Sequence, residues 1–143
     1  MRRKGEMDKD DIVDYYAEDY KIESYSYKMM GKMLEKEKVI LRLKKFNLQE
    51  IYIYGGGYLG VQLYLALKDT NTVKGIVDKN GGISVDIPEF IPAFTVEQLA
   101  ARYKDETIII TPIRYYSQIK NSLNNLIPED RILFLGEFLE GVV

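Results

Sequence analysis

The sequence contains no cysteine and no histidine. Their absence excludes thiol nucleophiles, disulfide bonds, histidine-based catalytic triads, and zinc or haem sites that use either residue. We therefore expect no metal site. No apolar run approaches the roughly 20 residues needed to cross a bilayer, so no membrane span is predicted. The basic start at residues 1–4 leads into acidic residues rather than an apolar stretch, so we expect no secretory signal, and the cytoplasm is the expected location.

An excess of positive charge is also missing. The formal net charge is -2, and the basic residues between Lys28 and Lys45 are interleaved with acidic ones. Binding to a phosphate backbone needs a basic face, so nucleic acid is not expected as a partner. With 143 residues, 46% of them hydrophobic, the chain is long enough for one domain with a hydrophobic core and too short for a nucleotide domain joined to a separate substrate domain.

The first third of the chain has the apolar spacing of amphipathic helices. We expect a helical extension over residues 1–48 and a separate α/β domain over residues 49–143. One helix is predicted to begin at Asp10 or Asp11, with Ile12, Tyr15, Tyr16 and Tyr20 at helical spacing. A second helix is predicted from about Tyr27 to Phe46. Its apolar side would contain Met30, Met33, Leu34 and Leu41.

Five of the twelve tyrosines lie between Tyr15 and Tyr27. Tyrosine combines a large apolar ring with a polar hydroxyl, which suits both cores and interfaces. Three roles stay open for this cluster: packing against the rest of the protomer, contact within a homo-oligomer, or binding of a partner enzyme.

The remainder alternates between short β-branched runs and helical segments. Such apolar runs are typical of parallel strands that are buried on both faces. Pro88 and Pro92 keep the chain extended after the second strand, and no helix fits between the second and third strands. We expect a Rossmann-like α/β sandwich of about five parallel strands in the order 3-2-1-4-5. The predicted strands are 51–54, 73–77, 93–94, 107–110 and 132–135, and the predicted helices are 59–67, 96–103 and 117–126.

The stretch Gly55-Gly56-Gly57-Tyr58-Leu59-Gly60 directly follows the first predicted strand and opens a helix. In a mononucleotide-binding unit, the first glycine permits a tight turn, the second lets backbone amides approach a pyrophosphate, and the third lets the helix pack closely on the sheet. The positions of Gly55, Gly57 and Gly60 match these roles. The sequence therefore predicts a phosphate site at the start of this helix.

Asp78 ends the second predicted strand, about 20 residues beyond the glycines, where a carboxylate can accept hydrogen bonds from a ribose diol. It would repel a 2′-phosphate, which favours NAD over NADP, although Lys79 follows directly. Asp78 also suits a simple turn at Asp78–Gly81. Thr111, Pro112 and Arg114 follow the fourth strand at the same sheet edge, where Arg114 is a candidate for binding phosphate or carboxylate.

A further element, Ile91-Pro92-Ala93-Phe94-Thr95-Val96-Glu97-Gln98-Leu99, follows the second strand without an intervening helix. With the glycine turn, Asp78 and Ile108–Pro112, it resembles small Rossmann domains related to CoA-binding domains and to the N-terminal domains of sugar-nucleotide epimerases and dehydratases. The resemblance covers about Gln49 to Phe138. It implies a nucleotide-binding module of bacterial surface-polysaccharide or nucleotide-sugar metabolism, with Gly55, Gly57, Gly60 and Asp78 as binding positions. It implies no catalytic domain.

The leading hypothesis is a domain that binds NAD or a nucleotide sugar and acts with, or regulates, a polysaccharide-biosynthesis enzyme without being catalytic alone. A small oxidoreductase or epimerase would need a proton donor, for which Tyr58, Tyr115, Tyr116 and Lys79 are candidates. A CoA-binding module, and an interaction module that has lost its ligand, are further alternatives. A methyltransferase usually has an acidic residue just before the glycine turn, where this chain has Ile53 and Tyr54.

Overall fold

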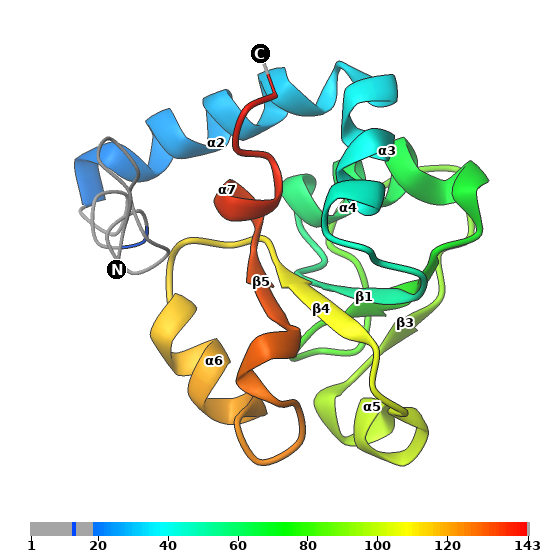
Figure 1. The fold of residues 1–143 in the computed structure, drawn as a ribbon. Coiled ribbons are helices and arrows are strands. Elements are labelled where there is room, and N and C mark those ends of the chain that lie inside the picture. The colour runs from blue at the N-terminus through cyan, green and yellow to red at the C-terminus, as the bar shows by residue number, and fades with distance from the viewer. Residues whose placement is uncertain (1–12, 14–18, 143) are drawn as a thin grey trace, which may run out of the picture.

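The protein folds around one parallel β-sheet with helices on both faces (Figure 1). The computed structural model describes Val13 and residues 19–142. Its strand order is β3-β2-β1-β4-β5, which confirms the predicted Rossmann-like architecture. The strands are β1 (Ile51–Tyr54), β2 (Val73–Val77), β3 (Ala93–Phe94), β4 (Thr107–Ile110) and β5 (Ile132–Phe134).

Helices α2, α3, α4 and α7 lie on one side of this sheet, and α5 and α6 lie on the other (Figure 1). Two 3₁₀ turns, η1 (Lys68–Thr70) and η2 (Glu129–Arg131), complete the described elements. The helices are α2 (Asp19–Met33), α3 (Lys36–Lys45), α4 (Tyr58–Leu67), α5 (Val96–Arg102), α6 (Tyr116–Leu123) and α7 (Leu135–Phe138).

The sheet is built from the short β-branched runs, which are covered on both faces. Every residue of β1 and β4 is buried, so neither strand needs a polar face. The predicted bounds of the first four strands are confirmed, and β5 ends one residue before the predicted Leu135, where α7 begins. Helix α5 begins after a capping box: the Gln98 amide donates to Thr95 Oγ1 at 3.1 Å, and the Thr95 amide donates to Gln98 Oε1 at 2.8 Å.

Residues 78–92 connect β2 to β3 without a helix or strand, as predicted. This connection folds back on the glycine turn, where the Ser84 amide donates to the Gly56 carbonyl at 2.8 Å. The connection therefore helps to shape the turn from outside the first βαβ unit.

The prediction of one helix from Tyr27 to Phe46 is wrong. The chain forms two helices, with a break at Leu34 and Glu35. Leu34 and Leu41, expected on the apolar side, are exposed at 77% and 60%. The buried positions are instead Tyr25, Met29 and Met33 on α2, and Val39 and Leu43 on α3. Because the step from 33 to 39 does not match the helical period, one straight helix cannot bury both sets.

The prediction of a first helix near Asp10 falls on residues outside the described part of the chain, as do Tyr15 and Tyr16. Tyr20 lies in α2, but its side chain is not described.

Helices α2 and α3 are attached to the end of the α/β body by hydrogen bonds to α7. The Lys32 ammonium donates to the Leu139 carbonyl at 3.1 Å, and the Arg42 guanidinium donates to the Phe138 carbonyl at 2.6 Å. Cationic side chains stabilise the last carbonyls of a helix in this way.

The division of the chain at residue 48 into a helical extension and an α/β domain stays a prediction. Within the described residues, no helix is both long and apolar enough to span a membrane.

Candidate functional site

The glycine turn joins β1 to α4 at the carboxyl edge of the sheet, and packing explains two of its glycines. Gly55 has φ +119°, and a side chain there would meet Thr111 Oγ1. A Cβ atom on Gly60 would overlap the Gly55 carbonyl oxygen. Both positions therefore need glycine for the fold alone, as predicted for the first and third glycines of the motif.

Gly57 differs from both, because no described residue other than its two chain neighbours has a heavy atom within 4 Å of the position that its Cβ would take. Its φ of -88° and ψ of -165° are open to any residue, and it precedes α4 without a capping side chain. The first amides of a helix have no partner within the helix, and together with the helix dipole they favour an anion. The space beside Gly57 is therefore available to a molecule outside the protein.

Asp78 lies at the end of β2 and is tied to the glycine turn. Its Oδ2 accepts a hydrogen bond from the Gly56 amide at 2.9 Å, and its Oδ1 accepts one from the Asn80 amide at 3.0 Å. A carboxylate offers about four lone-pair sites. Asp78 therefore serves the turn and keeps capacity for further donors. Its predicted role toward a ribose stays a prediction.

Gly56 is placed differently from its neighbours in the motif. Its amide is engaged by Asp78, its carbonyl accepts from Ser84, and a side chain there would meet the Gly82 carbonyl. Gly56 lies under the β2–β3 connection and lines neither of the two cavities described next. Its contribution is to hold Asp78 in place.

A larger cavity of about 1040 Å³ opens between α5 and α6 at the carboxyl edge of the sheet. This volume is sufficient for a nucleotide-sized ligand, since small-molecule sites span roughly 300–1,000 Å³. Burial, and then the charge of Asp78, raise the pKa of the Tyr54 hydroxyl, which lines this cavity. The lining includes Tyr54, Gly55, Asp78, Lys79, Thr95, Pro112, Arg114 and Gln118.

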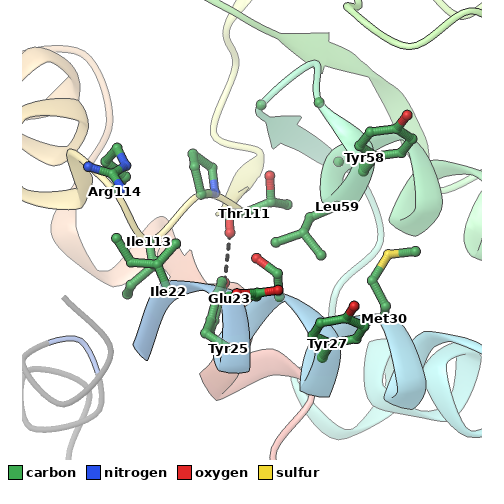
Figure 2. A pocket seen from close by; sticks show the side chains of 15 residues that line it. Ile22, Glu23, Tyr25, Tyr27, Met30, Tyr58, Leu59, Thr111, Ile113 and Arg114 are labelled. Atoms are coloured by element: carbon green, nitrogen blue, oxygen red, sulfur yellow. Dashed lines mark hydrogen bonds between the residues drawn. The ribbon is translucent and has the colours of Figure 1, made fainter. Parts of the chain in front are cut away.

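A smaller cavity of about 460 Å³ lies on the other side of Gly55, between α2 and the start of α4 (Figure 2). Most of its lining surface is apolar. Glu23 and Arg114 bring the charged groups, and Ser26, Tyr27 and Tyr58 bring hydroxyl groups. The two cavities share Gly55, Pro112 and Arg114. The smaller one is also lined by Ile22, Tyr25, Tyr27, Met30, Gly57, Tyr58, Leu59, Gly60, Thr111 and Ile113.

Thr111, expected among the ligand contacts, has its polar groups engaged within the protein. Its hydroxyl and its amide both donate to the Tyr54 carbonyl, at 2.8 and 3.0 Å. Its carbonyl accepts from the Tyr25 hydroxyl at 2.7 Å, drawn as a dashed line in Figure 2. With 2% of its surface exposed, Thr111 holds β1, β4 and α2 together beside the glycine turn.

Tyr25, one of the five clustered tyrosines, connects the N-terminal helices to this edge of the sheet by packing within the protomer, one of the three roles left open for the cluster. Tyr25 is fully buried, and its ring stacks on Phe134 at 5.5 Å between centroids. Helix α2 therefore crosses the carboxyl ends of β4 and β5. A second sequence signal was the spacing of Tyr25, Met29 and Met33, which places the three residues on one helix face.

The structure thus brings the predicted residues Gly55, Gly57, Gly60, Asp78 and Arg114 to one edge. Among the described residues, no group of three or more His, Cys, Asp or Glu side chains is placed to hold a metal. No known family model matches this chain, and neither curated proteins nor solved structures show significant similarity to it.

Proposed function

We propose that the chain is a binding module for a ligand with a nucleoside diphosphate group, either NAD or a nucleotide sugar. The diphosphate would lie at the start of α4, and the nucleoside would occupy the larger cavity. This arrangement follows the general rule that open α/β sheets bind ligands beyond the carboxyl ends of their strands, where the strand order reverses. Here that point lies between β1 and β4.

The observation that carries the proposal is the open space at Gly57. Packing accounts for Gly55, Gly56 and Gly60, since a side chain on any of them would meet another part of the chain. Nothing within the described protein occupies the corresponding space at Gly57. A glycine there has a physical reason if a ligand approaches the backbone closely, and the uncapped amides of α4 favour that ligand being an anion.

Asp78 supports the nucleoside part of the proposal. It lines the larger cavity and is fixed by two backbone amides, so its position does not depend on a ligand. A ribose diol would donate to its remaining lone pairs. The proposal assigns no catalytic residue. A role beside an enzyme of surface-polysaccharide or nucleotide-sugar metabolism is part of the proposal only through the resemblance noted in the sequence of residues 49–138, which no comparison with known proteins supports.

Binding can be tested by isothermal titration calorimetry and thermal unfolding with UDP, UDP-glucose, NAD and CoA. A ligand present at 100 times its dissociation constant stabilises the folded state by about 2.7 kcal/mol. We expect stabilisation by UDP, UDP-glucose or NAD. A response to CoA alone would favour the CoA-binding alternative, and no response to any of the four would favour the interaction module.

The role of Asp78 has its own test, a comparison of UDP with 2′-deoxy-UDP. Removal of one ribose hydroxyl should weaken binding to the native protein about tenfold, because one hydrogen bond to a charged group is lost. The variant Asp78→Asn should bind both nucleotides with similar affinity. If the native protein binds UDP and 2′-deoxy-UDP with equal affinity, Asp78 serves the turn alone.

A further inference from the structure

The smaller cavity shows what lies beyond the diphosphate, if the proposed function holds. It begins at Gly55 and Arg114, which also line the larger cavity, and it extends away toward α2. A ligand with its diphosphate over the glycine turn therefore reaches both cavities. Its nucleoside would enter the larger one, so its second group would enter the smaller one.

The apolar lining of this cavity comes from three parts of the chain. Ile22 and Met30 come from α2, Leu59 comes from α4, and Ile113 follows β4 (Figure 2). The hydrogen bond from Tyr25 to the Thr111 carbonyl and the stacking on Phe134 hold α2 against this edge. The cavity is therefore formed before a ligand arrives, and its chemistry selects the group that fits.

The lining disfavours a group covered with hydroxyls, because a hydroxyl that leaves water for an apolar wall loses its hydrogen bonds. A methyl group placed against the same wall gains from its burial. Glu23 and the hydroxyls of Ser26, Tyr27 and Tyr58 add polar groups to a mainly apolar lining, which suits a sugar with some hydroxyls and some apolar surface.

We propose that the smaller cavity binds the glycosyl group of a nucleotide sugar and selects sugars that carry an N-acyl or deoxy group over fully hydroxylated hexoses. The α2 helix, which lies outside the predicted nucleotide-binding domain, thereby determines specificity. This inference rests on the proposed nucleotide site and refines its ligand class.

UDP-N-acetylglucosamine and UDP-glucose provide a matched test, since they differ only in the substituent at C2 of the sugar. Calorimetry on the full chain should show UDP-N-acetylglucosamine binding at least about tenfold more tightly, the preference that one buried methyl group typically confers. UDP serves as the reference without a sugar. NAD tests whether a nicotinamide ring fills the cavity instead.

The variant Met30→Gln places an amide in the apolar wall on a helix-compatible side chain. It should reduce the preference for the N-acetyl sugar to about twofold or less and leave the affinity for UDP unchanged. Leu34→Gln is the matched control, because Leu34 is 77% exposed and lines neither cavity. This control should keep the full preference. Thermal unfolding of both variants verifies that they fold.

The two possible failures are distinguishable. If UDP binds but the N-acetyl sugar gains nothing over UDP-glucose, or if NAD binds more tightly than both sugars, the inference is overturned and the nucleotide site stands. If Met30→Gln and Leu34→Gln change the preference equally, the smaller cavity is not the sugar site. If neither UDP nor the other nucleotides bind, the proposed function itself fails.

Discussion

Gly57→Asp should stabilise the fold and abolish ligand binding, the trade-off expected where a binding site leaves local stability unused. Gly57 has the extended backbone of a helix N-cap and lacks a capping side chain, and its Cβ position is open. An aspartate there can accept hydrogen bonds from the first amides of α4. The same carboxylate would occupy the place of a diphosphate and repel it.

The magnitude follows from three contributions. Replacing glycine by aspartate at an N-cap stabilises the folded state by a few tenths of a kcal/mol. The helix dipole adds about 0.3–1 kcal/mol, and restriction of the unfolded chain adds about 0.4–1 kcal/mol. Repulsion from Asp78, which is bound to the neighbouring Gly56, reduces the sum. We expect a net gain of about 1 kcal/mol, or a rise of a few degrees in Tm.

Urea unfolding and calorimetry with UDP measure the two effects on the same sample. Gly31→Asp is the control with the same change in charge, because Gly31 also has open space at its Cβ position but lies in α2 and lines neither cavity. The control should keep its affinity for UDP. A fall of more than about 1 kcal/mol in the free energy of unfolding of Gly57→Asp would refute the claim that the N-cap position has room for a side chain. Unchanged UDP affinity in that variant would refute the anion site.

Three further substitutions test the packing around the site and the core. Gly60→Ala should destabilise the protein by about 1–3 kcal/mol in urea unfolding, since the new methyl overlaps the Gly55 carbonyl; a loss below about 0.5 kcal/mol would contradict that close approach. The Tyr52 hydroxyl is buried with no hydrogen-bond partner among the described residues, so Tyr52→Phe should leave the free energy of unfolding unchanged or raise it by about 1 kcal/mol, whereas a clear loss would reveal a partner. Burial alone would raise the pKa of Glu106, but hydrogen bonds from the Lys74 ammonium at 2.7 Å and the Lys104 amide at 2.6 Å outweigh it and lower that pKa below 4.5. The stability from Glu106 is therefore complete above its ordinary pKa and is lost as the pH falls through the lowered one, and Glu106→Gln should flatten the pH dependence of urea unfolding on the acid side of that ordinary value.

Local signals were sufficient to predict the α/β body. Each strand is a short β-branched run between turn residues, and the Thr95–Gln98 pair marks the start of α5 by a hydrogen-bond pattern that depends on four consecutive residues. The glycine spacing predicted the turn for the same reason, because the backbone at Gly55 and the close packing at Gly60 are local requirements.

The features that the sequence did not predict depend on tertiary contacts. The break between α2 and α3 contains neither proline nor glycine at Leu34 and Glu35, and it forms because Met33 and Val39 both become buried against the body. The Asp78–Gly56 hydrogen bond depends on how residues 78–92 fold back. The smaller cavity depends on Tyr25 reaching Thr111, 86 positions further along the chain, which no short-range pattern encodes.

The bonds from Asp78, Ser84 and Thr111 to the residues around the glycine bend have a kinetic consequence. A bend fixed from several directions cannot close around an incoming molecule, so docking should be a single encounter without a slow rearrangement afterwards. In stopped-flow experiments the observed rate should then rise linearly with nucleotide concentration and show no plateau.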